Sequence, residues 1–77
     1  MEDMDELHRE NLRKLKLGLP YLLEHNREHV KNIQTWIERA KDAHQDGVVD
    51  DLQNVLKLSR QINEYFERAL DKLEHNE

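Results

Sequence analysis

The stretch Lys16-Leu17-Gly18-Leu19-Pro20 (KLGLP) decides how many helices the chain forms. The residues on both sides of it have the apolar spacing of three and four residues that is typical of amphipathic helices. Glycine is a poor helix former, and a proline ring clashes with the carbonyl group four residues earlier in a helix. The stretch therefore predicts a helix break, with a short helix at about residues 4–17 and another that begins at about residue 20.

A second break is expected at Asp46-Gly47, a dipeptide that favours turns. It separates helices predicted at about residues 20–45 and 50–74, which a short connection makes an antiparallel hairpin. One proline and two glycines in 77 residues indicate an all-α chain, and we expect a single helical domain over residues 1–77. Two arrangements are open at this break. Either the shorter N-terminal helix folds back to complete a three-helix bundle, or the chain only kinks and leaves this helix free to pack against a second copy, so that the hairpin dimerises into a bundle.

Apolar residues of the predicted third helix form a heptad row that should face the other helices. The row consists of Leu52, Val55, Ser59, Ile62, Phe66, Ala69 and Leu73, and Leu56 and Leu70 widen it. On the preceding helix, Trp36 is expected to be the largest side chain of the core.

The composition excludes several classes of function. Charged residues make up 38% of the chain and the net charge is −5, which argues against nucleic acid as a partner because phosphates require a positive surface. There is no cysteine, no apolar run of the roughly 18 residues that span a membrane, and no basic and apolar leader at the acidic start. We therefore expect a cytoplasmic protein. A bundle this small leaves little room for a substrate pocket, which predicts that the protein is not an enzyme.

His25, Asn26 and His29 place polar side chains on a helix face that should be buried. His25 and His29 are four residues apart, so their side chains are neighbours on one surface. If the first helix folds back, a transition-metal site results, in which zinc or nickel would suit the imidazole ligands. The predicted ligands are His8, His25, His29 and Glu67, and the neighbouring amides are Asn11, Asn26 and Asn63. The alternative is a buried polar network that fixes the register of the helices.

Three functions remain open at this point. The first is a small non-enzymatic interaction module whose partner is another helical protein or a second copy in a homodimer. The second is a metal-binding protein that uses the histidine cluster. The third is a pH-responsive element, because protonation of all five histidines would bring the net charge from −5 to zero.

The segment from Tyr21 to Leu73 also resembles a group of short, uncharacterised prokaryotic helical proteins. The resemblance depends on a Leu-Leu pair, the His-Asn-x-x-His segment at His25 to His29, and Trp36 seven residues later. It implies a helical fold and carries no known function.

Overall fold

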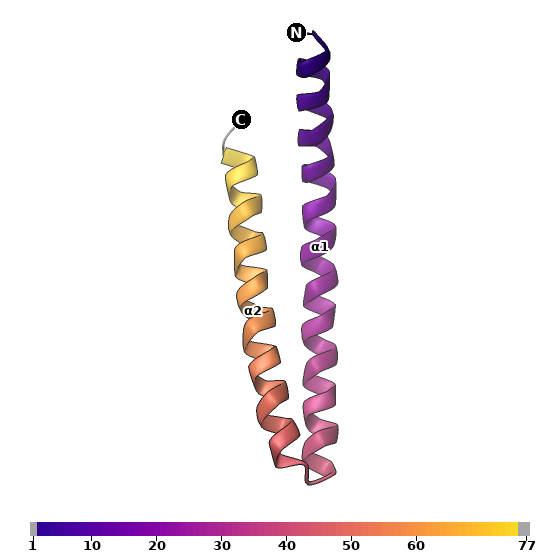
Figure 1. Ribbon diagram of the computed structural model, residues 1–77, viewed down its shortest axis with the longest axis vertical. Helices are drawn as coiled ribbons and strands as arrows, with labels where there is room; N and C mark the ends of the chain where they lie inside the picture. The colour runs from indigo at the N-terminus through magenta and orange to yellow at the C-terminus, as the bar shows by residue number, and fades with distance from the viewer. Residues whose placement is uncertain (1, 76–77) are drawn as a thin grey trace.

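The computed structural model describes the backbone of residues 2–75 and the side chains of residues 5–75. Two helices, α1 (Glu2–Asp42) and α2 (Asp46–His75), run antiparallel and pack against each other (Figure 1). They form a rod 62 Å long and 16 Å wide, and α1 extends beyond the end of α2. The all-α hairpin predicted from the sequence is confirmed, whereas the described residues form no third helix.

The helix break predicted at Gly18 and Pro20 is wrong. α1 continues for 41 residues with Pro20 inside it, so the segments predicted at about residues 4–17 and 20–45 are one helix. Pro20 has no N–H group to donate to the carbonyl group of Lys16, which costs the helix one hydrogen bond. The apolar row nevertheless continues from Leu19 to Leu23, and a break would turn the two halves of the row away from a common partner. Packing along α2 therefore outweighs the local preference.

The turn between the helices is short and begins earlier than predicted, at Ala43. His44 has a φ angle of 57°, in the left-handed region that glycine usually occupies at the end of a helix. The N–H of His44 donates to the carbonyl oxygen of Lys41, and that of Gln45 to the carbonyl oxygen of Ala40, both at 3.0 Å. This pair of hydrogen bonds is a Schellman motif, with histidine in the place of glycine.

α2 begins four residues before the predicted start at about residue 50. The carbonyl oxygen of Gln45 already accepts the N–H of Val49 at 3.0 Å, so the first helical hydrogen bond forms directly after the turn. Gly47 lies inside the first turn of α2 and does not have a positive φ angle. The expected turn at Asp46-Gly47 is thus displaced to Ala43–Gln45.

The core is a narrow seam between the two helices. The buried residues are Leu23, Ile33, Ile37 and Ala40 of α1 and Val49 and Ser59 of α2. Leu52 and Leu56 pack against this core. The predicted row of α2 is at least partly buried except at Val55 and Ile62, which are exposed. Leu56 and Leu70, predicted to widen the row, are partly buried too, and Asn63 lies in the seam.

Trp36 is not a core residue, contrary to the prediction from the sequence. Its side chain is 56% exposed, and the guanidinium group of Arg39 lies 4.5 Å from the centre of its ring. A hairpin of two helices has only one seam, and the positions beside Trp36 that face it are taken by Ile33 and Ile37. The largest apolar side chain of α1 is therefore left on the surface.

Candidate functional site

A polar link crosses the middle of the seam at Asn26. Its Nδ2 atom donates one hydrogen bond to the carbonyl oxygen of Ser59 at 3.1 Å and another to Oδ1 of Asn63 at 2.7 Å. Both N–H directions of the amide are thus satisfied, as a polar group inside an apolar seam requires. The link fixes the register of α1 against α2, the role that a single asparagine has in many coiled coils.

Two of the predicted metal ligands, His25 and His29, lie close to this link on α1 with exposed side chains. The ring of His25 stacks on the ring of Tyr21, with 6.1 Å between the ring centres. His8 is 17 residues before His25 on the same continuous helix, about 25 Å away along its axis. Since α1 does not fold back, neither His8 nor Asn11 approaches the histidine pair.

The fourth predicted ligand, Glu67, has a different partner. Its Oε1 atom lies 3.2 Å from Nη2 of Arg27, in an ion pair that joins the two helices across the surface. Among the side chains of residues 5–75, no three His, Cys, Asp or Glu groups are placed to hold a metal ion. One chain therefore brings together the His25–His29 pair and the Asn26–Asn63 link, but not the complete predicted set.

A row of exposed residues on α1 is the more prominent surface feature. It consists of Leu15, Leu22, His29 and Trp36, which follow one another at intervals of seven residues. Leu22, His29 and Trp36 each stand one residue before a residue of the seam. Each residue turns a helix by about 100°, so this row lies beside the seam and not on the far side of α1.

α2 carries a matching row. It consists of Val48, Val55, Ile62 and Ala69, also at intervals of seven residues. Its large members, Val48, Val55 and Ile62, are 41–48% exposed, and each stands one residue before a residue of the seam. Leu58 and Tyr65, both more exposed, border this row on its outer side.

The two rows lie on the same side of the hairpin. Both are displaced from the seam by one residue toward the N-terminus of their own helix. A step of one residue toward the N-terminus turns the side chain by about 100° around the axis of its helix. Because the two helices are antiparallel and face each other, this step leads to the same side of the hairpin on both helices. Together the two rows form one continuous surface, the uncovered face, which has no charged member in a chain with 38% charged residues.

The opposite side of the hairpin is charged. Arg27 and Glu67 each follow a seam residue by one position, so their ion pair lies across the seam from the uncovered face. Lys16 and Glu74 also lie on this side, together with the exposed ring of Pro20. The hairpin thus has one charged face and one face of mainly apolar side chains.

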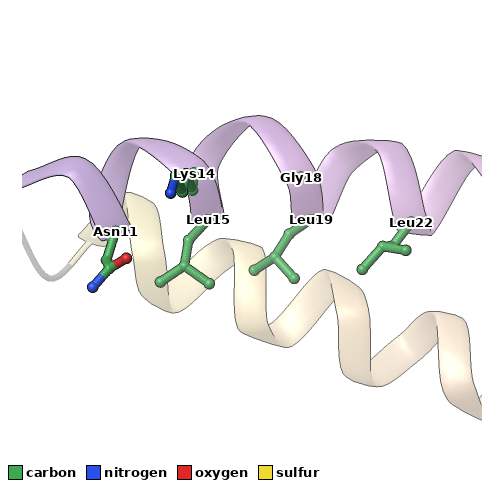
Figure 2. A pocket seen from close by; sticks show the side chains of 6 residues that line it. All are labelled: Asn11, Lys14, Leu15, Gly18, Leu19 and Leu22. Atoms are coloured by element: carbon green, nitrogen blue, oxygen red, sulfur yellow. The ribbon is translucent and has the colours of Figure 1, made fainter.

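The uncovered face is hollowed near the end of α2. Figure 2 shows Leu15, Leu19 and Leu22 in line along the side of α1 that faces α2. With Asn11, Lys14 and Gly18 they line a hollow of about 400 Å³. Gly18 leaves this space open, since nothing lies within 4 Å of the position that a Cβ atom would occupy there.

Sequence reasoning found the histidine pair but not the uncovered face. A signal was present in the heptad spacing of Leu15, Leu22 and Trp36, which runs parallel to the row that is buried. The predicted break at Pro20 concealed this spacing by assigning Leu15 and Leu22 to different helices.

No described helix has the length and apolar character needed to cross a membrane.

Comparison with known proteins gives a family. A family model described as "Domain of unknown function (DUF8180)" matches residues 15–73. No curated protein and no solved structure matches the chain. The matched segment includes both rows of the uncovered face, from Leu15 to Ala69, and the Asn26–Asn63 link, but not His8. Since the match covers well over half of the 77 residues, the protein belongs to the DUF8180 family.

Proposed function

We propose that the protein is a non-enzymatic helical assembly module that pairs with a second copy of itself through the uncovered face. The observation that carries this proposal is the pair of heptad rows. They give one side of the hairpin the mainly apolar composition that is usual for side chains in a protein core. A layer of helices with an apolar side is stable when a second layer covers that side. Two such hairpins packed face to face form a four-helix bundle.

The thin core supports a need for a partner. Among residues 5–75 only five hydrophobic residues are buried: Leu23, Ile33, Ile37, Ala40 and Val49. Chains shorter than about 80 residues without a disulfide or a metal ion commonly rely on oligomerisation for stability. Covering the uncovered face would give Trp36, Leu22 and Ile62 the burial that the single hairpin does not provide.

The dimensions of the face fit a dimer. The part of α1 that is paired with the 30 residues of α2 is about 45 Å long. With the 16 Å width of the rod, each copy offers about 700 Å², close to the roughly 800 Å² that each partner buries in a stable interface. The two rows contain no charged residue, and Lys14 and Arg39 border them near Leu15 and Trp36. Two identical apolar faces of this kind are complementary to each other.

Replacement of Leu22 by glutamate tests this proposal. Leu22 is 45% exposed in the hairpin, so the charge remains hydrated in a monomer but would be buried in the dimer. We expect Leu22→Glu to turn a dimer into a monomer in analytical ultracentrifugation, with helical content by circular dichroism unchanged.

Leu17→Glu is the matched control. Leu17 is also an exposed leucine of α1, with 71% of its surface accessible, but it does not belong to the uncovered face. This variant should remain dimeric. A monomeric parent protein at high concentration, or equal effects of the two substitutions, would contradict the proposal.

A further inference from the structure

We infer that two copies of the hairpin pair antiparallel about a two-fold axis at His29, and that His25 and His29 of both copies then form a site for a divalent transition-metal ion such as Zn²⁺. The inference rests on the proposed self-pairing and extends it by assigning the axis and a ligand. Its basis is the symmetry of the two rows, the register of the helices and the position of the histidine pair.

The row on α1 is symmetric about His29. A two-fold axis through His29, perpendicular to the helix, places Leu22 of one copy opposite Trp36 of the other. It also places Leu15 opposite Ala43, the next residue at the same seven-residue spacing. Larger side chains then face smaller or open positions, which suits packing between helices.

The row on α2 is symmetric about a point between Leu58 and Ser59. Rotation about that point exchanges Val55 with Ile62 and Val48 with Ala69. Every apolar residue of this row thus meets another apolar residue of the same row in the second copy.

The register of the hairpin lets one axis serve both rows. Asn26 is hydrogen-bonded to Ser59 and Asn63, which fixes the levels of α1 and α2 relative to each other. His29 is three residues further along α1, so it lies level with residues about three positions earlier on the antiparallel α2, at 56–60. This range contains the centre of symmetry of the α2 row beside Leu58. The two centres therefore coincide, although the two rows come from different parts of the sequence.

The axis gathers imidazole groups. His29 of one copy lies against the partner's His29, and His25 follows one helical turn away in each chain, on the same surface. His25 lies about 6 Å along the helix from the axis, so the four imidazoles of the two copies gather around it, where each chain alone offers two. Zinc takes four ligands in tetrahedral structural sites, and imidazole suits zinc, nickel and copper.

The apolar surroundings favour a bound ion over unoccupied imidazoles. Along the row, Leu22 and Trp36 flank His29, so dimerisation would remove its ring from water. A polar group that is buried without a partner is destabilising, and a metal ion shared between the rings satisfies it. Arg27 is the basic residue between His25 and His29 in the sequence. Its ion pair with Glu67 holds its side chain on the opposite face, so its positive charge lies away from the metal site.

The test uses the untagged 77-residue chain, first treated with a chelator and then titrated with ZnCl₂. We expect calorimetry to give one zinc ion for every two chains, and sedimentation to show a dimer dissociation constant that falls about tenfold or more with zinc. His29→Ala should abolish zinc binding while the helical content and the metal-free dimer persist. His8→Ala, a histidine outside the uncovered face, should behave as the parent protein.

The outcomes separate the site from the assembly. A dimer that zinc leaves unchanged, or zinc bound once to each chain, would overturn the shared site and leave the self-pairing intact. A protein that is monomeric with and without zinc would overturn both. Unchanged zinc binding by the His29→Ala variant would also refute the assignment of the ligands.

Discussion

Asn26 is the residue of α1 whose side-chain hydrogen bonds fix how the two helices of the hairpin are aligned. It is the only asparagine in the described part of the structure with a side-chain hydrogen bond to both the backbone and a side chain of the opposite helix. The sequence predicted Asn26 and Asn63 as members of a polar cluster, and the structure places them together. The accompanying prediction of His8 and Asn11 in the same layer depended on a fold-back that does not occur.

Substitution of Asn26 by alanine should lower the free energy of unfolding by about 1–3 kcal/mol, because it removes both hydrogen bonds of the link and leaves Oδ1 of Asn63 in the seam without its donor. Chemical denaturation of the variant and the parent protein at equal concentration measures the difference. The double variant Asn26→Leu with Asn63→Leu should recover most of this loss, since both polar groups are replaced by apolar ones. A single variant as stable as the parent would show that the link does not contribute.

At the scale of the element, α1 shows how tertiary packing overrides a local preference. Gly18 and Pro20 together favour a break, yet the helix continues because its apolar row needs one unbroken partner surface on α2. The hairpin was predictable from composition and apolar spacing, which depend on residues near one another in sequence, although its turn lies at Ala43–Gln45 and not at Asp46-Gly47. The continuity of α1 was not, because it depends on contacts between residues about 50 positions apart, such as those around Pro20 and Leu70.

Replacement of Pro20 by alanine should raise the free energy of unfolding by about 1–3 kcal/mol, because it restores an N–H donor inside the helix and removes the clash of the ring with the preceding turn. Gly18→Ala is a graded companion, with an expected gain of about 0.5–1 kcal/mol, as nothing lies within 4 Å of the added methyl group. Thermal or urea unfolding compares the three proteins. A loss of stability in Pro20→Ala would mean that contacts of the ring with α2 exceed the cost of the missing hydrogen bond.

The boundaries of α2 show a second limit of sequence reasoning. Asp46-Gly47 was expected in the turn because glycine supplies positive φ angles, yet the residue with the positive φ angle is His44. The Schellman hydrogen bonds to Ala40 and Lys41 stabilise this conformation in spite of the side chain. The residue that adopts the positive φ angle is set by the point at which the packed seam ends. That point depends on the register of the two helices, which the sequence alone did not predict.

At the scale of the whole molecule, the exposed position of Trp36 has the same origin as the uncovered face. A single seam buries only the side of each helix that faces the other, so the apolar heptad row beside the seam remains at the surface on each helix. The sequence-based placement of Trp36 in the core treated all apolar residues of α1 as one stripe. In the proposed dimer this residue would be covered, which reconciles its size with its place in the fold.

The melting temperature should rise with protein concentration, because association of two folded chains stabilises the folded state by mass action. Circular dichroism melts at two concentrations that differ about a hundredfold would show a shift of several degrees in the parent protein. Leu22→Glu should lose the shift and melt at the lower temperature at both concentrations. Identical melting curves of the parent protein at both concentrations would contradict a dimer that contributes to stability.

The hairpin brings the start of α1 and the end of α2 to the same pole of the rod (Figure 1). An antiparallel pair would therefore present two such poles facing away from each other. His29, at the proposed axis, is 27 residues from the start of α1, or about 40 Å along the helix. Any larger protein joined to either end would therefore be carried at opposite tips of a stiff strut about 80 Å long. Such a strut would work as a spacer that keeps two identical cargoes apart at a fixed distance.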